Sequence, residues 1–334
     1  MTKIISFRRT PEVQPEARPP ESKKTIAVLP VVREYLAAVK GNLQPRTHTD
    51  YRLKLTVFAA WCDASEVSLD RIERTAVSRF VEHIRTTHHS QKAGHPPVSS
   101  HTLACYVRTI KACLNWLATD VIYGEIVKEE IVRRIEMPPT EKMIVTTFSD
   151  EQIRQMLRAS RQEESEHMRR RAAAVIALLI GTGIRASELL GLTMENTVLS
   201  QDKPYIKVFG KGRKERIVPM GQITVLKVQH YVDGFRRDAL AAAPLFLDRT
   251  QEKALGRDGL DGIIKRLGHY AGIEGVRLSA HTFRHSYSKN FMSRGGNIYH
   301  LSKILGHTGT GVTEHYLRDL GTWDLYDQVQ AQLR

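Results

Sequence analysis

Several separated stretches of the sequence carry residues that could act together on one phosphate group. The stretches are "TGIRASELLGL", "KGRKERIVP", "HTFRHS" and, near the end of the chain, "LGHTGTGVTEHYL". Together they supply two guanidinium groups, an amine, two imidazoles and a phenol. The residues are Arg185, Lys211, His281, Arg284, His307 and Tyr316.

This set meets the chemical demands of phosphoryl transfer to a tyrosine. Two guanidinium groups can hold the non-bridging phosphate oxygens and stabilise the charge of the transition state. A phenol has an ordinary pKa of about 10, so its attack needs a nearby imidazole or a positive field. The departing 5′-oxygen needs a proton, which a mobile lysine can give. The pattern therefore indicates Tyr316 as a nucleophile.

Each residue also has an ordinary explanation when taken alone. Arg185 at a helix start could bond a nearby carboxylate such as Glu188, and a lysine in a hairpin turn is usually solvated. Tyr316 could be a half-buried aromatic residue of a terminal helix. The spacing of His281 and His285 can bind a metal, but no glutamate completes an HExxH motif, so we expect no metal site.

The elements that must position these residues belong to a predicted second domain, 149–334, which follows a linker at 138–148. Ser149 with Gln152 three residues later predicts a capping box and a helix start. The apolar stretch "RRRAAAVIALLIGTG" predicts a helix that Gly181 and Gly183 stop. Two β-rich runs around "GKGRK" predict a hairpin, and helical patterns return after Gly259.

The region before the linker is helical in pattern throughout. Residues 1–24 read as a flexible arm, and four amphipathic stretches within 25–137 predict a small helical bundle. The fold class is therefore mainly α with a small antiparallel β-sheet in the C-terminal domain (α+β). Basic residues of the bundle and of the hairpin turn are candidates for phosphate contacts, although a solvated surface would look the same: Arg46, His48, Arg52, Lys54, Arg213 and Lys214.

The overall charge indicates a polyanionic partner. Fifty Lys and Arg residues against 36 Asp and Glu residues give a net charge of +14. Such a surplus favours binding to DNA, RNA or an acidic membrane, and charge alone does not separate these. Three cysteines without a CxxC pair fit a reduced, cytoplasmic setting, and no apolar run predicts a secretory signal or a membrane span.

The second domain resembles the catalytic domain of the tyrosine recombinases, the family of phage integrases and chromosome-dimer resolvases. That family carries an ordered set of Arg, Lys, His-x-x-Arg, His or Trp, and Tyr, and the four stretches quoted above match it in order and spacing. The resemblance covers about 149–320 strongly. The helical first domain resembles the family's core-binding domain more weakly.

The resemblance implies a role for each residue of the set. Tyr316 would form a 3′-phosphotyrosyl bond, Arg185 and Arg284 would activate the phosphate, and His307 would support it by a hydrogen bond. His281 would assist proton transfer. Lys211 would be the general acid on the 5′-hydroxyl, with Lys214 as its competitor.

The resemblance also implies partners. The DNA partner would be a duplex with inverted-repeat core sites. Four copies of the protein would assemble on it as a homotetramer and exchange their C-terminal tails. The protein would be associated with the nucleoid. An accessory directionality factor is a possible further partner. Neither metal nor ATP is implied, because the covalent link conserves the phosphoester energy. No cofactor is therefore expected.

Three functions remain in competition. The first is site-specific recombination, in which integration or excision of a mobile element is preferred to chromosome-dimer resolution because the arm and loops depart from the compact resolvase pattern. The second is a type IB-like DNA topoisomerase, which shares much of the chemistry but would relax supercoils as a monomer. The third is a DNA-binding protein without catalysis.

Overall fold

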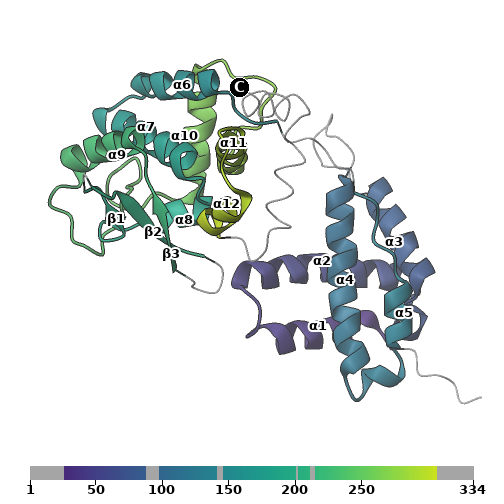
Figure 1. The fold of residues 1–334 in the computed structure, drawn as a ribbon. Coiled ribbons are helices and arrows are strands. Elements are labelled where there is room, and N and C mark those ends of the chain that lie inside the picture. Colours follow the sequence, from purple (N-terminus) through teal and green to yellow (C-terminus); the bar gives the residue numbers. More distant parts are fainter. Residues whose placement is uncertain (1–25, 88–97, 141–145, 201, 211–214, 307–334) are drawn as a thin grey trace, which may run out of the picture. The chain divides into compact units, whose positions relative to one another are not determined.

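The computed structural model describes residues 26–87, 98–140, 146–200, 202–210 and 215–306 (Figure 1). The chain divides into two compact units, Met1–Lys142 and Met143–Arg334. Each has its own hydrophobic core. The fold is mainly helical with one small antiparallel sheet in the second unit, which confirms the predicted fold class.

In its described residues the first unit contains the four predicted helices and a further short α-helix. They are α1 (Val28–Val39), α2 (Pro45–Ala64), α3 (Arg74–Thr87), α4 (Ser100–Thr119) and the short α5 (Glu129–Arg134). An aromatic cluster joins α2, α3 and α4, in which the ring of Phe80 lies 5.0 Å from Phe58 and 5.7 Å from Tyr106. Edge-to-face contacts of this kind add to the stability that burial provides.

The second unit begins with α6 (Asp150–Ala159), and its start confirms the predicted capping box. The Ser149 hydroxyl accepts a hydrogen bond from the Gln152 backbone N–H at 3.1 Å, and the Gln152 side chain accepts one from the Ser149 N–H at 3.0 Å. Immediately before it, Phe148 is buried, and its N–H donates to the Ser286 hydroxyl at 2.9 Å.

Helix α7 (Glu166–Thr182) runs through Gly181, so the prediction that this glycine stops the helix was wrong. Gly181 instead makes room for Thr224 of α9 (Gln222–Phe235), whose hydroxyl donates to the Ala177 carbonyl at 3.2 Å. The helix ends at Gly183, which has φ 63° and adopts the left-handed conformation that glycine favours.

Helix α9 also corrects the sequence prediction, which placed no helix between the hairpin and Gly259. Its buried residues Thr224, Val228, Tyr231 and Val232 follow a three- and four-residue spacing. They pack against α7, and α7 and α9 lie side by side in Figure 1. Helical structure therefore resumes 37 residues earlier than expected (259 − 222).

A three-stranded antiparallel sheet packs beside these helices. Its strands are β1 (Thr197–Val198), β2 (Tyr205–Phe209) and β3 (Glu215–Pro219), in the order β1-β2-β3. The β2–β3 pair confirms the predicted hairpin, with buried Ile206 opposite buried Val218. The very short β1 was not predicted.

The other α-helices in the described part of the second unit are α8 (Ala186–Leu190), α10 (Arg257–Tyr270), α11 (Ala280–Ser293) and α12 (Ile298–Leu305). Helix α11 packs on α7, and Phe283, near the N-terminal end of α11, is fully buried in the core. None of the described helices has the length and apolar character that crossing a membrane requires.

Candidate catalytic site

The turn between α7 and α8 places Arg185 beside α11 and α12. Gly183 is required here for two reasons: its φ of 63° disfavours a side chain, and a Cβ atom would collide with the ring of Tyr287 and lie 3.1 Å from Leu305. Two residues later, Arg185 is the N-cap of α8, with Glu188 in the first turn of that helix.

Arg185 is oriented by Glu188. Its backbone N–H donates to Glu188 Oε2 and its Nη1 to Glu188 Oε1, both at 2.8 Å. The carboxylate contact that was weighed as an ordinary explanation of Arg185 is therefore confirmed. The Arg185 side chain nevertheless remains 39% exposed, and its Nη2 reaches the Gly306 carbonyl at 3.4 Å.

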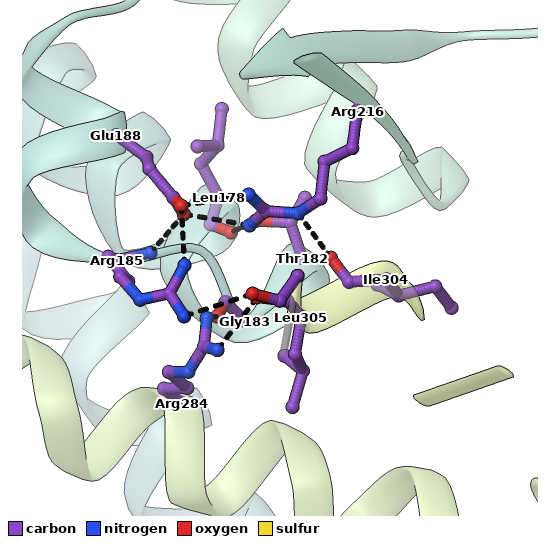
Figure 2. Close-up of polar contacts among 10 residues, drawn as sticks. Leu178, Thr182, Gly183, Arg185, Glu188, Arg216, Arg284, Ile304 and Leu305 are labelled. Carbon is purple, nitrogen blue, oxygen red and sulfur yellow. Dashed lines mark hydrogen bonds and ion pairs between the residues drawn. The ribbon is translucent and has the colours of Figure 1, made fainter. Parts of the chain in front are cut away.

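Arg284 on α11 is buried, with only 2% of its surface exposed. Its Nη1 donates to the Gly183 carbonyl at 2.9 Å and its Nη2 to the Leu305 carbonyl at 2.8 Å. Arg185 and Arg284, 99 positions apart in the chain (284 − 185), thus bind consecutive carbonyl groups at the C-terminal end of α12 (Figure 2). The structure brings together these two predicted arginines.

A third arginine, Arg216 of β3, was missed by the sequence analysis. Its Nη1 and Nη2 donate to the two carboxylate oxygens of Glu188 at 2.8 Å each, and its Nε donates to the Ile304 carbonyl at 2.6 Å. A signal was present in the sequence: Arg216 lies two residues before the core residue Val218, on the inward side of the strand.

The site carries an excess of positive charge. The site contains three guanidinium groups, of which Arg185 and Arg216 pair with the buried carboxylate of Glu188, and this leaves a surplus of +2 among the four side chains (3 − 1). Burial by itself would raise the pKa of Glu188, but hydrogen bonds from Arg216 and Arg185 lower it below its ordinary value, so the carboxylate stays ionised. A phosphate oxygen near these guanidinium groups would be stabilised electrostatically.

His281 lies on α11 with Arg284, as the sequence predicted. It is exposed, and its ring lies 4.4 Å from the buried ring of His285, centroid to centroid. Within the described ranges, no group of three His, Cys, Asp or Glu residues could hold a metal ion.

The other predicted site residues of the second unit, Lys211, Arg213, Lys214, His307 and Tyr316, lie outside the described residues. Gly306, the last described residue, directly precedes His307 in the chain.

The candidate phosphate contacts of the first unit lie on α2, and they divide into two kinds. Arg46 and Arg52 are exposed. His48 Nε2 is hydrogen-bonded to the Leu36 carbonyl at 3.0 Å, and Lys54 pairs with Asp50 one turn earlier. His48 and Lys54 therefore already have partners within the unit.

Comparisons with known proteins identify the family. The model of the phage integrase family matches residues 146–321, just over half of the chain (176 of 334 residues). Tyrosine recombinase XerD of Shewanella oneidensis is 31% identical over 55% of this chain and 60% of its own length. Tyrosine recombinase XerD of Pseudomonas aeruginosa is 26% identical over 86% of this chain and 92% of its own length.

Solved structures share the fold. XerH site-specific recombinase bound to a palindromic difH substrate matches with a TM-score of 0.68 and 16% identity, over 94% of this chain and 92% of that one. A lambda integrase dimer bound to a COC′ core site matches with a TM-score of 0.66 and 12% identity, over 89% and 79%. The chain belongs to the phage integrase family and is a tyrosine recombinase, an enzyme that cleaves and rejoins DNA strands without metal or ATP.

Proposed function

We propose that this protein is a site-specific recombinase whose nucleophile is Tyr316 and whose phosphate activators are Arg185 and Arg284. The observation that carries the proposal is the meeting of both arginines at the C-terminal end of α12, eleven positions before Tyr316 (316 − 305). Their guanidinium groups would stabilise the non-bridging oxygens of the scissile phosphate.

In the proposed cleavage step, the DNA strand is transferred from its 5′-oxygen to the Tyr316 oxygen. The Tyr316 oxygen attacks phosphorus and loses its proton with the assistance of His281, while the bond between phosphorus and the 5′-oxygen breaks. Lys211 gives its proton to the leaving 5′-oxygen, and His307 donates a hydrogen bond to a phosphate oxygen. The 3′-phosphotyrosyl bond keeps the phosphoester energy, so attack by a 5′-hydroxyl of another strand reverses the step and joins the strands.

The two domains would have separate roles in binding and cleaving DNA. Residues 25–137 would form the core-binding domain, 138–148 the linker and 149–334 the catalytic domain, with DNA held largely by phosphate contacts. Arg46 and Arg52, exposed on α2, are the strongest candidates for such contacts in the first region. Four protomers would assemble on two duplexes and exchange C-terminal tails, as integrases and resolvases do.

A plasmid assay tests recombination against topoisomerase activity. Target duplexes are first selected by covalent capture of wild-type protein on a nicked pool with randomised arms, and two copies are cloned into one supercoiled plasmid. The proposal predicts products in which the DNA between the copies is deleted or inverted. Relaxation of supercoils without either product would contradict recombination and favour a topoisomerase.

The biological role that we propose is integration and excision of a mobile element, for which the Pro- and Arg-containing arm at 1–24 is the supporting observation. Chromosome-dimer resolution is the second candidate, since relatives named XerD align with 86% of the chain. Amplification across a circular junction in host cells decides between them. An excised circle that disappears when the gene is deleted supports the role in a mobile element. Multimeric chromosomes in the deletion strain, without any excised circle, support chromosome-dimer resolution.

A further inference from the structure

We propose that Arg216 is a positioning residue for strand cleavage: it fixes the C-terminal end of α12 against the carboxylate that orients Arg185. This inference deepens the proposed function and rests on it. Arg216 reaches both partners at once, because Nε donates to the Ile304 carbonyl while Nη1 and Nη2 hold Glu188 (Figure 2).

Arg216 faces the protein and not the solvent. Its side chain is 12% exposed, and that of Glu188 is 3% exposed. All three of its nitrogen atoms donate to protein acceptors in a forked geometry, which a guanidinium group supplies and an ammonium group does not. The contacts therefore suit a residue that orients Glu188 and the end of α12.

A second contact links Arg216 to the end of α12. A Cβ atom on Gly306 would lie 3.0 Å from Arg216 Nη1 and 3.1 Å from its Cδ and Cζ atoms. Gly306 also has φ 66°, the left-handed conformation that ends the helix. The guanidinium group thus packs on the residue that directly precedes His307, in addition to binding the carbonyl of Ile304.

Arg216 also determines how Arg185 shares its carboxylate. Glu188 Oε1 accepts from Arg185 Nη1 and from Arg216 Nη1, each at 2.8 Å. Without Arg216, the buried carboxylate would have Arg185 as its one remaining guanidinium partner among the described residues. We expect Arg185 then to turn toward Glu188 and away from Gly306 and the phosphate, because a buried carboxylate without full pairing is costly.

The test compares Arg216→Lys with a matched control, Arg266→Lys. Arg266 also donates two hydrogen bonds to a buried carboxylate, that of Glu163, at 3.1 and 3.2 Å. Both variants keep the positive charge and lose the two parallel hydrogen bonds from a guanidinium group to a buried carboxylate. We therefore expect both to lose thermal stability. Single-turnover formation of the covalent adduct is then measured at saturating protein, on the nicked duplex selected by wild type, together with the Kd for that duplex.

We expect Arg216→Lys to slow adduct formation by about 10- to 100-fold, since small misplacements of catalytic groups have effects of this size, with little change in Kd. Arg266→Lys should retain the wild-type rate. An unchanged rate in Arg216→Lys, or a weaker Kd with an unchanged rate, would overturn the proposal. Failure of wild type itself to form an adduct would instead count against the proposed function.

Hydrogen exchange gives a readout that does not depend on cleavage. Backbone amides of 298–306 should exchange faster in Arg216→Lys than in wild type, and should be unchanged in Arg266→Lys, because of these two arginines only Arg216 binds α12. Equal exchange in both variants would show that Arg216 does not hold this helix and would overturn the inference.

Discussion

At the scale of single residues, the site depends on guanidinium groups that bind backbone carbonyls. Arg216, Arg284 and Arg185 bind the carbonyls of Ile304, Leu305 and Gly306 in turn. A helix C-terminus carries partial negative charge, and cations stabilise it. The same positive groups that hold the helix end in this structure would be near a phosphate.

Arg284→Lys should abolish most cleavage as well as destabilise the fold. Lysine cannot donate to the Gly183 and Leu305 carbonyls with the geometry of Arg284, and buried carbonyls without partners cost about 1–3 kcal/mol each. Adduct formation at saturating DNA should fall about 100-fold or more. Adduct kinetics and thermal unfolding measure the two effects separately.

The control is Arg171→Lys, because Arg171 is also an arginine buried to 3% exposure that donates to a carbonyl, that of Leu247, at 2.8 Å. It should lose stability and keep the cleavage rate at a temperature where it is folded. If both variants lose cleavage equally, the effect of Arg284 is one of folding and its role as an activator is refuted.

The choice between Lys211 and Lys214 as general acid is open to a chemical test. A duplex with sulfur in place of the bridging 5′-oxygen has a leaving group that needs no proton. Cleavage by Lys211→Ala should therefore be slow on the oxygen duplex and close to wild type on the sulfur duplex. Rescue of Lys214→Ala instead would reassign the acid to Lys214.

Sequence reasoning at this scale found Arg185 and Arg284 but not Arg216. The first two belong to motifs whose chemistry is recognisable from residue types. Arg216 acts through the backbone carbonyl of Ile304, 88 positions away, and carbonyl groups carry no sequence signal. The alternation with Val218 indicates that the Arg216 side chain lies on the inward side of β3. It does not indicate which group that side chain binds.

At the scale of elements, the end of α12 is the part on which the site depends. Gly306→Ala should cost about 1 kcal/mol because alanine disfavours the left-handed conformation. It should also displace Arg216, since the new methyl group would lie 3.0–3.1 Å from that side chain. Adduct formation by this variant should therefore be slower than its loss of stability explains.

Gly272→Ala is the matched control for that change. Gly272 has φ 63°, and no atom lies within 4 Å of a Cβ placed there. It should show the same loss of stability in thermal unfolding with wild-type adduct kinetics. Equal kinetics in the two variants would mean that the contact between Gly306 and Arg216 has no catalytic consequence.

The packing of α7 against α9 makes the second unit sensitive to acid. Burial and the neighbouring Arg171 lower the pKa of His167 from 6.5 to about 4. The unfolded chain therefore binds a proton that the folded protein excludes between these values, so stability falls as the pH decreases from 6.5 to 4. His167→Gln should lose less stability than wild type over that range in urea unfolding; an equal loss would show that His167 is not responsible.

The elements themselves could be predicted where a local rule decides them. The capping box at Ser149 and the β2–β3 hairpin are such cases. No local rule predicts that α7 continues through Gly181. The glycine lies within the helix because Thr224, from the later helix α9, packs against it. Close packing between distant elements overrides a local propensity.

At the scale of the whole molecule, the composition indicated the class of partner and the family match identifies the reaction. A net charge of +14 favours a polyanion, and membership of the tyrosine recombinases makes DNA that polyanion. The charge could not do this alone, because RNA and acidic membranes attract the same surplus.

The point of covalent attachment is the most direct test of the account. Wild-type protein is captured on the selected nicked duplex, digested with nuclease and protease, and mapped by mass spectrometry. We predict a nucleotide 3′-phosphate on the peptide that contains Tyr316, and no adduct from Tyr316→Phe. A nucleotide on Tyr287, Tyr299 or Tyr326, or an adduct that persists in the Phe variant, would contradict the assignment of Tyr316 as the nucleophile.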